Sequence, residues 1–405
     1  MQGEEEERYD VAIVGGGPAG LSAALSAAQS GAKVILLEKD EAIAHSVRTS
    51  GVTWIDSMEA LGIPSRYYNP IQSYRFVSPE NEVMISGEAA RCCVLDVRAT
   101  YQYLAMLAAQ SGAKIMVRST VSNVLKDSSS GKVNGIKAST PRGDLVVNCS
   151  LVIDASGFSS SVARRAGAVS EWRRYGVGAE YECYCDNADS STWTLMVGQQ
   201  YSEAGYAWVF PLSANRVRIG VGIGRPESGA DPLDRLHALM DRRLKPLDSL
   251  GNIQPIELHY GFIPNEGVRK TTISDGLLMV GDSAGQSNPL VLEGIRYAIE
   301  FGRLAGRVGA ESVAQGSTVK SLAEYDKVWR EKVESKINSA LKVQSRWIGL
   351  SDEQWDREIE ILRDMTVDEF IDFIKADFTA GKMMRLALHH PKLAARQLFN
   401  MIVKK

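Results

Sequence analysis

The stretch Tyr9–Gly20, YDVAIVGGGPAG, is the most informative part of the chain for its fold. Its first six residues form a short apolar run that is typical of a strand buried on both faces. Its glycines then follow the spacing Gly-x-Gly-x-x-Gly, and the small residues after Gly20 favour a helix that ends at Gly31. A second apolar run, KVILLEK, begins at Lys33. The stretch therefore predicts a strand–turn–helix–strand unit of about 30 residues.

The glycines of this turn predict a binding site for a pyrophosphate. Gly15 allows the tight turn, Gly17 lets the backbone approach the anion, and Gly20 lets the helix pack close to the strand. The first turn of the helix, which contains Pro18 and Ala19, offers free N–H groups and the positive end of the helix dipole. The alternative is a glycine-rich turn that binds nothing.

An acidic residue ends the second strand of the unit. Glu38 lies 18 residues after Gly20 and is followed by Lys39. A carboxylate at this place can accept hydrogen bonds from both hydroxyls of an adenosine ribose, and it repels a 2′-phosphate. We therefore expect a nucleotide without a phosphate at that position.

Two later segments favour FAD over NAD as this nucleotide. Gly281-Asp282 follows the apolar run GLLMV and precedes a predicted helix, so the carboxylate can bind the hydroxyls of a ribityl chain. Asp154–Gly157, DASG, ends another apolar strand. Each segment alone is compatible with an ordinary turn, but the three motifs in this order predict FAD.

The composition is that of an ordinary globular protein with two or three domains. The 405 residues are 44% hydrophobic and 23% charged, and 46 basic against 49 acidic residues give a net charge of −3. A charge this close to neutral argues against nucleic acid as the main partner. The acidic start of the chain is no secretory signal, and no apolar run reaches the ~18 residues that a membrane span needs. We therefore expect a cytoplasmic protein.

The cysteines indicate neither a disulfide scaffold nor a metal site. Five cysteines in a chain of this length, at positions 92, 93, 149, 183 and 185, do not match zinc-finger spacing, and the sequence has five histidines. Reduced thiols are the main interpretation, and a redox disulfide is the alternative. No metal ligands are predicted.

The order of the segments predicts a Rossmann-type domain interleaved with an antiparallel sheet and followed by a helical tail, an α/β plus α+β chain. From about residue 177 to 224, four β-rich runs with turn signals predict the second sheet. We expect FAD-binding segments at 1–70, 96–172 and 269–316, substrate-domain segments at 71–95 and 173–268, and a helical region at 317–405.

The helical tail divides by charge. Ser351–Asp377 holds ten acidic and three basic residues, and Lys382–Lys405 holds six basic residues and no acidic one. The basic part could lie on an anionic membrane surface at the inner face of the cell membrane, as a peripheral contact. The alternative is a packed helix whose basic residues pair with the acidic segment before it.

The chain resembles the flavoproteins built like para-hydroxybenzoate hydroxylase, which show these three motifs in this order. Within that group, Tyr206–Pro211, YAWVFP, with Gly220 resembles the YxWxFP…G pattern of the geranylgeranyl reductase family. The resemblance covers residues 9–310, and the length and helical tail also look like those of the archaeal members.

The resemblance implies a role for each matched position. The glycine-rich turn and Glu38 would hold the ADP part of FAD, Arg98 would lie near the flavin, and Gly281-Asp282 would hold the ribityl-phosphate end. A loop from Asn288 to Ile295 would cover the isoalloxazine ring. Along the chain the FAD positions are Gly15, Gly17, Pro18, Ala19, Gly20, Glu38, Lys39, Arg98, Asp154, Gly157, Gly281, Asp282, Pro289, Gly294 and Ile295.

The chain departs from the family pattern at three places. Ser50 precedes Gly51 where members often carry a cysteine. Val291–Glu293 stands where the loop is usually rich in glycine, and DASG replaces the usual Asp-Gly motif.

The resemblance implies reduction of isoprenoid C=C bonds, in which reduced FAD delivers a hydride and an acid or water delivers a proton. The predicted substrate is a geranylgeranyl chain of an archaeal-type glycerophospholipid, with a prenylated quinone as the alternative. Alternation along a strand places Tyr206, Trp208 and Phe210 on one face, where they, with Pro211 and Gly220, would line an apolar pocket or else form the packed core of the sheet. Tyr206 is a candidate proton donor by position alone.

No second Gly-x-Gly-x-x-Gly occurs, so the electron donor is expected to visit the protein as NADPH, NADH or a reduced ferredoxin. Two rival functions remain open at this point. One is a flavin-dependent monooxygenase or halogenase, because YAWVFP partly resembles the halogenase pattern WxWxIP. The other is a membrane-associated FAD-binding protein without turnover.

Overall fold

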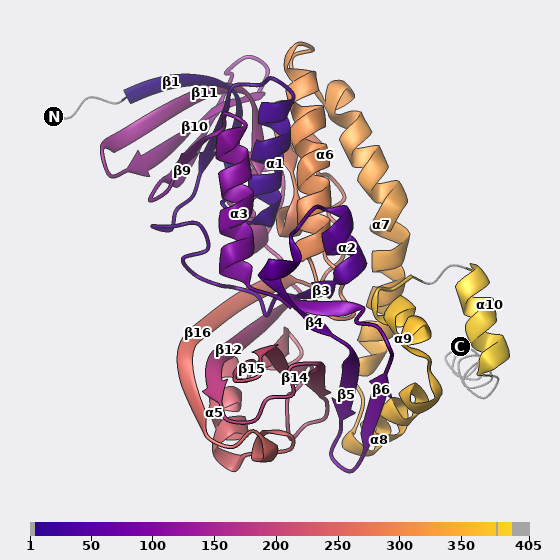
Figure 1. Ribbon diagram of the computed structural model, residues 1–405. Coiled ribbons are helices and arrows are strands. Elements are labelled where there is room, and N and C mark those ends of the chain that lie inside the picture. The colour runs from indigo at the N-terminus through magenta and orange to yellow at the C-terminus, as the bar shows by residue number, and fades with distance from the viewer. Residues whose placement is uncertain (1–4, 378–379, 391–405) are drawn as a thin grey trace.

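The computed structural model describes residues 5–377 and 380–390, and Figure 1 shows two sheet-based units joined by long helices. The upper unit contains an eight-stranded sheet whose central path runs β17-β18-β11-β1-β2-β8, with β10 paired to β11 and β9 paired to β10. Its strands are β1 (Glu5–Val14), β2 (Val34–Leu37), β8 (Lys114–Met116), β9 (Thr120–Lys126), β10 (Val133–Thr140), β11 (Gly143–Asp154), β17 (Ile273–Ser274) and β18 (Leu277–Met279).

The lower unit contains a seven-stranded sheet of order β16-β12-β15-β14-β13-β5-β6. Its strands are β5 (Ser73–Val77), β6 (Glu82–Ser86), β12 (Tyr175–Cys185), β13 (Thr192–Met196), β14 (Tyr206–Ser213), β15 (Arg216–Arg225) and β16 (Ile253–Pro264). A three-stranded sheet lies between the two units and consists of β3 (Val52–Trp54), β7 (Cys92–Leu95) and β4 (Tyr68–Ile71).

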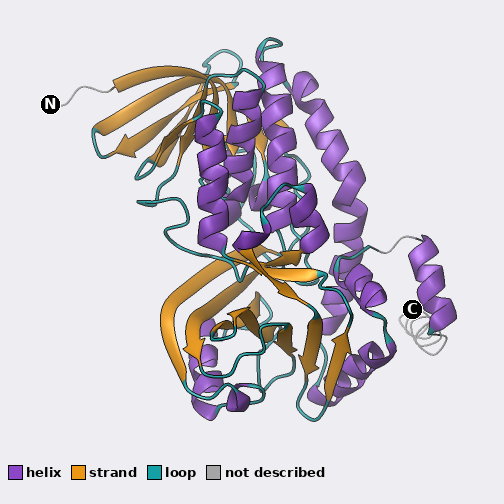
Figure 2. Cartoon of the chain, viewed as in Figure 1, coloured by secondary structure: helices purple, strands orange, loops and turns teal. Residues whose placement is uncertain are grey.

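Figure 2 shows most helices gathered on one side of the upper sheet and along the lower unit. They are α1 (Pro18–Gln29), α2 (Ile55–Ala60), α3 (Val97–Gln110), α4 (Ser161–Arg165), α5 (Pro232–Arg242), α6 (Ile295–Val313), α7 (Val319–Trp347), α8 (Asp352–Glu360), α9 (Val367–Ile374) and α10 (Ala380–His389). The predicted strand–turn–helix–strand unit is confirmed as β1, α1 and β2.

The upper sheet is buried on both faces, as its apolar strands predict. Along β1, Val11 and Ile13 point into a core shared with α1, α3, α6 and α7, whereas Ala12 and Val14 point into a second core beneath β9 and β10. The run of small residues in α1 lets this helix pack closely between the sheet and α6. The parallel core strands therefore carry the glycine-rich turn on a rigid base.

The lower sheet differs from the expected antiparallel sheet at one pair of strands. β12, β14, β15 and β16 pair antiparallel, as predicted, but β5 runs parallel to β13. The physical reason is that β5 enters from a segment over a hundred residues earlier, so no tight hairpin dictates its direction. One face of this sheet packs on α5, and the other packs an aromatic core against α8 and α9.

The described part of the tail, residues 317–377 and 380–390, is mostly helical, as predicted. α7 begins with a capping box in which Thr318 and Ser321 exchange side-chain and backbone hydrogen bonds. Lys382, at the start of the basic segment, pairs with Asp372 and Asp377 of the acidic segment. The rest of the basic segment, residues 391–405, lies outside the described residues.

Candidate functional site

Three strands of the upper sheet end in register, which brings the three sequence motifs together. Val14 of β1 pairs with Asp154 of β11, and Asp154 pairs with Met279 of β18. Because the strands are parallel, the turns that follow them meet at one edge of the sheet, where open α/β sheets bind their ligands. The turns after β1, β11 and β18 all contribute to one large cavity.

The turn after β1 requires glycine at two positions. Gly15 has a φ of +113°, and a Cβ on it would lie 2.3 Å from the carbonyl oxygen of Ala155. A Cβ on Gly20 would lie 1.9 Å from the carbonyl oxygen of Gly15. These contacts lock the start of α1 against the strand ends, so neither position tolerates a side chain.

The start of α1 opens into the cavity. Gly17, Pro18 and Ala19 line it, nothing lies within 4 Å of where a Cβ on Gly17 would sit, and no side chain caps the helix. Free N–H groups at a helix N-terminus bind phosphate oxygens. The turn is thus an open cradle of the shape that a pyrophosphate needs.

Glu38 and Lys39 line the same cavity next to this cradle. Glu38 is buried, and its carboxylate accepts hydrogen bonds from the backbone N–H groups of Gly16 at 2.5 Å and Asp40 at 2.9 Å. A carboxylate has about four acceptor positions, so it retains capacity for ribose hydroxyls. The backbone bonds fix its orientation toward the turn.

Of the two residues predicted in the turn after β11, one lines the cavity and the other supports the turn from behind. Gly157 lines the cavity, whereas Asp154 is fully buried behind the turn. Asp154 accepts hydrogen bonds from the N–H groups of Ser156 and Ala163, at 3.0 and 2.7 Å. Asp154 therefore shapes the turn and start of α4, and any part in binding FAD would be indirect.

The turn after β18 presents a carboxylate to the cavity. Gly281 and Asp282 both line it, and the carboxylate of Asp282 makes no hydrogen bond within the described part of the chain. Desolvation raises the pKa of Asp282 to about 6. An unpartnered carboxylate in such a wall is suited to accept hydrogen bonds from a polyol.

The loop from Asn288 to Ile295 forms the next part of the wall and is tied down on two sides. The Asn288 side chain donates to the carbonyl oxygen of Ile374 in α9 at 2.7 Å, and the Tyr206 hydroxyl donates to that of Val291 at 2.8 Å. Pro289, Gly294 and Ile295 line the cavity, and α6 begins there without a side-chain cap. A second helix N-terminus thus faces the cavity.

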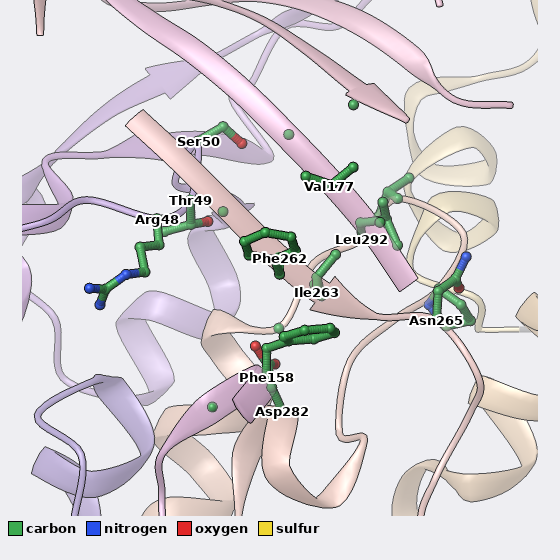
Figure 3. A pocket seen from close by; sticks show the side chains of 18 of the residues that line it. Arg48, Thr49, Ser50, Phe158, Val177, Phe262, Ile263, Asn265, Asp282 and Leu292 are labelled. Atoms are coloured by element: carbon green, nitrogen blue, oxygen red, sulfur yellow. The ribbon is translucent and has the colours of Figure 1, made fainter. Parts of the chain in front are cut away.

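These features fit FAD. The open cradle at α1 suits the pyrophosphate, Glu38 suits the adenosine ribose, and the free carboxylate of Asp282 suits a ribityl chain. Figure 3 shows Arg48, Thr49 and Ser50 on one side of the cavity, Leu292 and Asn265 on the other, and Phe158 beside Asp282.

The cavity is larger than a dinucleotide site and continues into an apolar arm. Its volume is about 1710 Å³. Beyond the loop from Asn288 to Ile295, it runs between α7, α8, α9 and the lower sheet. This arm is lined by Val343, Trp347, Trp355, Leu362, Met365 and Phe373.

Tyr206, Trp208 and Phe210 share one face of β14, as the alternation predicts, but they differ in exposure to the cavity. Tyr206 and Trp208 line it. Phe210 packs beside Trp193 and lines a small neighbouring pocket, and the buried Pro211 lies outside the cavity wall. Burial raises the pKa of Tyr206, whose hydroxyl proton is already engaged by Val291.

Gly220 makes room for the Trp208 ring. A Cβ on Gly220 would lie 2.3 Å from that ring, which crosses over β15 to reach β12. There the indole Nε1 donates a hydrogen bond to the carboxylate of Glu180 at 2.7 Å. This explains why the tryptophan and the glycine occur together in the sequence pattern.

The sequence did not predict the polar side chains that lie beside Trp208 and Gly220 in the lower sheet. Trp208, Gly220, Glu180 and His259 pair across four adjacent strands. Glu180 and His259 are 3% exposed, line the cavity and hydrogen-bond to each other. The available signal was the pair of glutamates that alternate with apolar residues in GVGAEYECYC, because acidic residues on an inner strand face need partners.

Arg98 lies apart from the cavity. Its guanidinium pairs with Glu257 at 2.6 Å, donates to the carbonyl oxygens of Ala44 and His45, and lines a separate small pocket. A direct contact of Arg98 with the flavin therefore stays a prediction.

The remaining predicted features lie outside the cavity. All five cysteines are free and buried, and burial raises the pKa of Cys92 and Cys93. Within residues 5–377 and 380–390, no three His, Cys, Asp or Glu side chains gather as metal ligands would. In the same ranges, every helix is too short or too polar to cross a bilayer.

Known proteins are similar to this chain in sequence and in fold. Residues 10–243 match the family described as FAD dependent oxidoreductase. Digeranylgeranylglycerophospholipid reductase 2 of Methanothermobacter thermautotrophicus is 32% identical over 357 residues, 86% of this chain and 90% of that protein. A crystal structure of a geranylgeranyl bacteriochlorophyll reductase-like protein from Thermoplasma acidophilum is 25% identical, with a TM-score of 0.84 over 96% of this chain and 98% of that chain.

A flavin-dependent brominase shares the fold alone, at 18% identity and a TM-score of 0.70 over 96% of this chain and 100% of that chain. The reductase from Methanothermobacter, in contrast, matches in sequence over most of both chains. The chain therefore belongs to the FAD dependent oxidoreductases and, among them, to the digeranylgeranylglycerophospholipid reductase family.

Proposed function

We propose that this protein is an FAD-dependent reductase that saturates the C=C bonds of geranylgeranyl chains, in archaeal-type membrane glycerophospholipids. The observation that carries the proposal is the single cavity of about 1710 Å³ that joins the FAD cradle to an apolar arm. Relatives named digeranylgeranylglycerophospholipid reductase support the same substrate class.

Bound and reduced, FAD supplies the hydride for one alkene carbon. The protein orients the chain and excludes water. An isolated alkene offers no polar group for recognition, so the wall must be apolar and shaped. Trp347, Trp355 and Phe373 supply that surface, and their rings contact one another at centroid distances of 5.7 and 5.8 Å.

The electron donor is part of the proposal and comes from outside the protein. The three-motif site accounts for one dinucleotide, and the sequence carries one Gly-x-Gly-x-x-Gly turn. NADPH, NADH or a reduced ferredoxin would therefore bind transiently. Supplying each donor in turn to the oxidised enzyme and following loss of flavin absorbance identifies it.

We also propose that the protein works in the cytoplasm and contacts the membrane peripherally. On α10, Met384 and Leu388 are 67% and 75% exposed and lie four residues apart, with the exposed Arg385 between them. An exposed apolar pair beside a basic residue is suited to an anionic lipid surface. Contact with the membrane would bring the enzyme to its lipid substrate.

The test is an anaerobic single-turnover experiment. The purified flavoprotein is reduced with dithionite and mixed with geranylgeranylated glycerophospholipid or, as control, with the fully saturated lipid. We expect the unsaturated lipid alone to reoxidise the flavin, with a gain of two mass units per reduced bond. A flavin that stays reduced until oxygen enters would contradict the proposal and favour a monooxygenase or halogenase.

A further inference from the structure

Reduction of an alkene needs a proton as well as a hydride, and this inference rests on the proposed function. The hydride forms a C–H bond at one carbon, and the π electrons form the second C–H bond with a proton. In the arm, the carboxylate of Glu358 lines the wall but is paired with the guanidinium of Arg346 at 2.6 Å. The cavity wall next to Trp208 offers another source, because two buried titratable side chains, Glu180 and His259, stand there.

The two side chains are held in a fixed geometry. His259 Nδ1 lies 2.8 Å from Glu180 Oε1, and Trp208 Nε1 donates to Glu180 Oε2 at 2.7 Å. The carboxyl group thus lies between the imidazole and the indole ring that lines the cavity. These two contacts restrict rotation of the Glu180 side chain, so its carboxyl group is held in place at the cavity wall.

The imidazole connects this carboxyl group to the surface. His259 Nε2 is buried without a hydrogen-bond partner among the described residues, and it lies 3.6 Å from Oε2 of Glu257. Glu257 is 33% exposed at the small outer pocket that Arg98 also lines. A carboxylate, an imidazole and a second carboxylate therefore lead from solvent to the cavity.

Opposite charges surround the pair in equal number. The carboxylates of Glu180 and Glu182 come from β12 and that of Glu257 from β16, whereas the guanidinium groups come from α3 and β15. Three carboxylates thus face three guanidinium groups, those of Arg98, Arg216 and Arg218. Counted as ionised, these six side chains carry no net charge, so a proton carried by the pair adds one positive charge, which its transfer to the alkene removes.

We propose that Glu180 is the catalytic acid that protonates the alkene, and that His259 is a positioning residue that reloads it from Glu257 and solvent. The O–H bond of Glu180 breaks as the C–H bond forms. His259 then passes the proton on Nδ1 to Glu180 and takes another at Nε2. The reduced flavin loses two electrons with its hydride, and the alkene gains them.

The first test is the Glu180→Gln variant, which keeps the shape and an acceptor for Trp208 Nε1 but removes the acid. We expect anaerobic flavin reoxidation by the prenyl lipid to slow about 100-fold or more. The flavin spectrum and the dissociation constant of the lipid for the oxidised enzyme should stay unchanged. A variant that binds FAD and lipid and reacts within threefold of the wild-type rate overturns the proposal.

The second test separates relay from structure. His259→Ala should slow turnover, and added imidazole should restore it, because the small base can replace the missing side chain. The matched control is His237→Gln, an exposed histidine of α5 that contacts Tyr181 on the opposite face of β12. We expect no change and no imidazole effect there. A slow His259→Ala enzyme that imidazole leaves unchanged overturns the relay.

A third measurement needs no variant. Wild-type turnover in D₂O should place deuterium on a single face of the protonated carbon, because a fixed acid approaches from one side. Deuterium on both faces would overturn the proposal even if the variants fail to fold. A wild-type enzyme that reduces no prenyl chain contradicts the proposed function itself, and the two failures are therefore distinguishable.

Discussion

Asp282 lines the cavity without a counter-charge, and this gives it opposite effects on stability and on binding. Desolvation raises its pKa to about 6, so the folded protein binds this proton more tightly than the unfolded chain does. The stabilisation from the protonated form is complete below about pH 4 and is lost as the pH rises through 6. Above pH 6, the folded protein carries a desolvated charge that costs about 3 kcal/mol.

Asp282→Asn removes this charge. We expect the FAD-free variant to be more stable than the wild type by up to about 3 kcal/mol at pH 8 and equally stable near pH 4, measured by urea unfolding. Its affinity for FAD should fall about tenfold, because hydrogen bonds to a charged acceptor are lost. The control Asp241→Asn, at an exposed position of α5, should change neither quantity. An equal gain at both pH values would contradict the desolvation argument.

The residues of the open turn before α1 were the most predictable part of the cavity wall, since each glycine acts within its own turn. Tyr206 and Trp208 were also predictable, because alternation along one strand fixes the side that they face. Glu180 and His259 were not, since these residues are 79 positions apart along the chain and their meeting depends on the register between β12 and β16. A local pattern carries no information on that register.

At the scale of elements, the close approach of α1 and α6 sets the position of both helix N-termini in the cavity. A Cβ on Gly306 of α6 would lie 2.2 Å from the carbonyl oxygen of Ala23, and one on Gly302 would lie 2.5 Å from that of Ala19. The two helices therefore touch backbone to backbone. Any added side chain there must push the helices apart.

We expect Gly306→Ala to lower the free energy of unfolding by about 1–3 kcal/mol, as overpacking does, despite the better helix propensity of alanine. Thermal unfolding of the flavoprotein measures the effect, and FAD affinity should fall with it, because the N-terminus of α6 shifts. Glu311→Ala, at an exposed position of the same helix, should change stability by less than about 0.5 kcal/mol. A Gly306→Ala protein as stable as the wild type would show that the helices can separate freely.

The elements themselves followed from the sequence where the pattern was local, as in β1, α1 and the runs that form β12 to β15. The parallel pairing of β5 with β13 did not follow, because it joins segments more than a hundred residues apart. The same holds for the helices of the tail. Their amphipathic pattern predicted helices, but the surface that they cover depends on long-range packing.

At the scale of the whole molecule, α7 links the two units. It has 29 residues, which corresponds to about 44 Å, and it starts where the N–H of Val319 donates to Asp275 next to β17. Its other end, with Val343 and Trp347, forms the wall of the apolar arm. The helix therefore fixes how far the cavity extends from the start of α1. We expect the length of the arm to limit the length of the prenyl chain that can bind.

A larger side chain in the arm should therefore slow the reaction of long prenyl chains more than that of short ones. We expect Val343→Trp to slow reduction of a geranylgeranyl lipid at least tenfold while a geranyl analogue, half as long, reacts within threefold of the wild-type rate, measured by anaerobic flavin reoxidation. Val319→Trp is the matched control, because Val319 is 46% exposed at the far end of the same helix. It should leave both rates unchanged. Equal slowing of both lipids by Val343→Trp would place the chain elsewhere, since a block at the end of the arm affects only a substrate long enough to reach it.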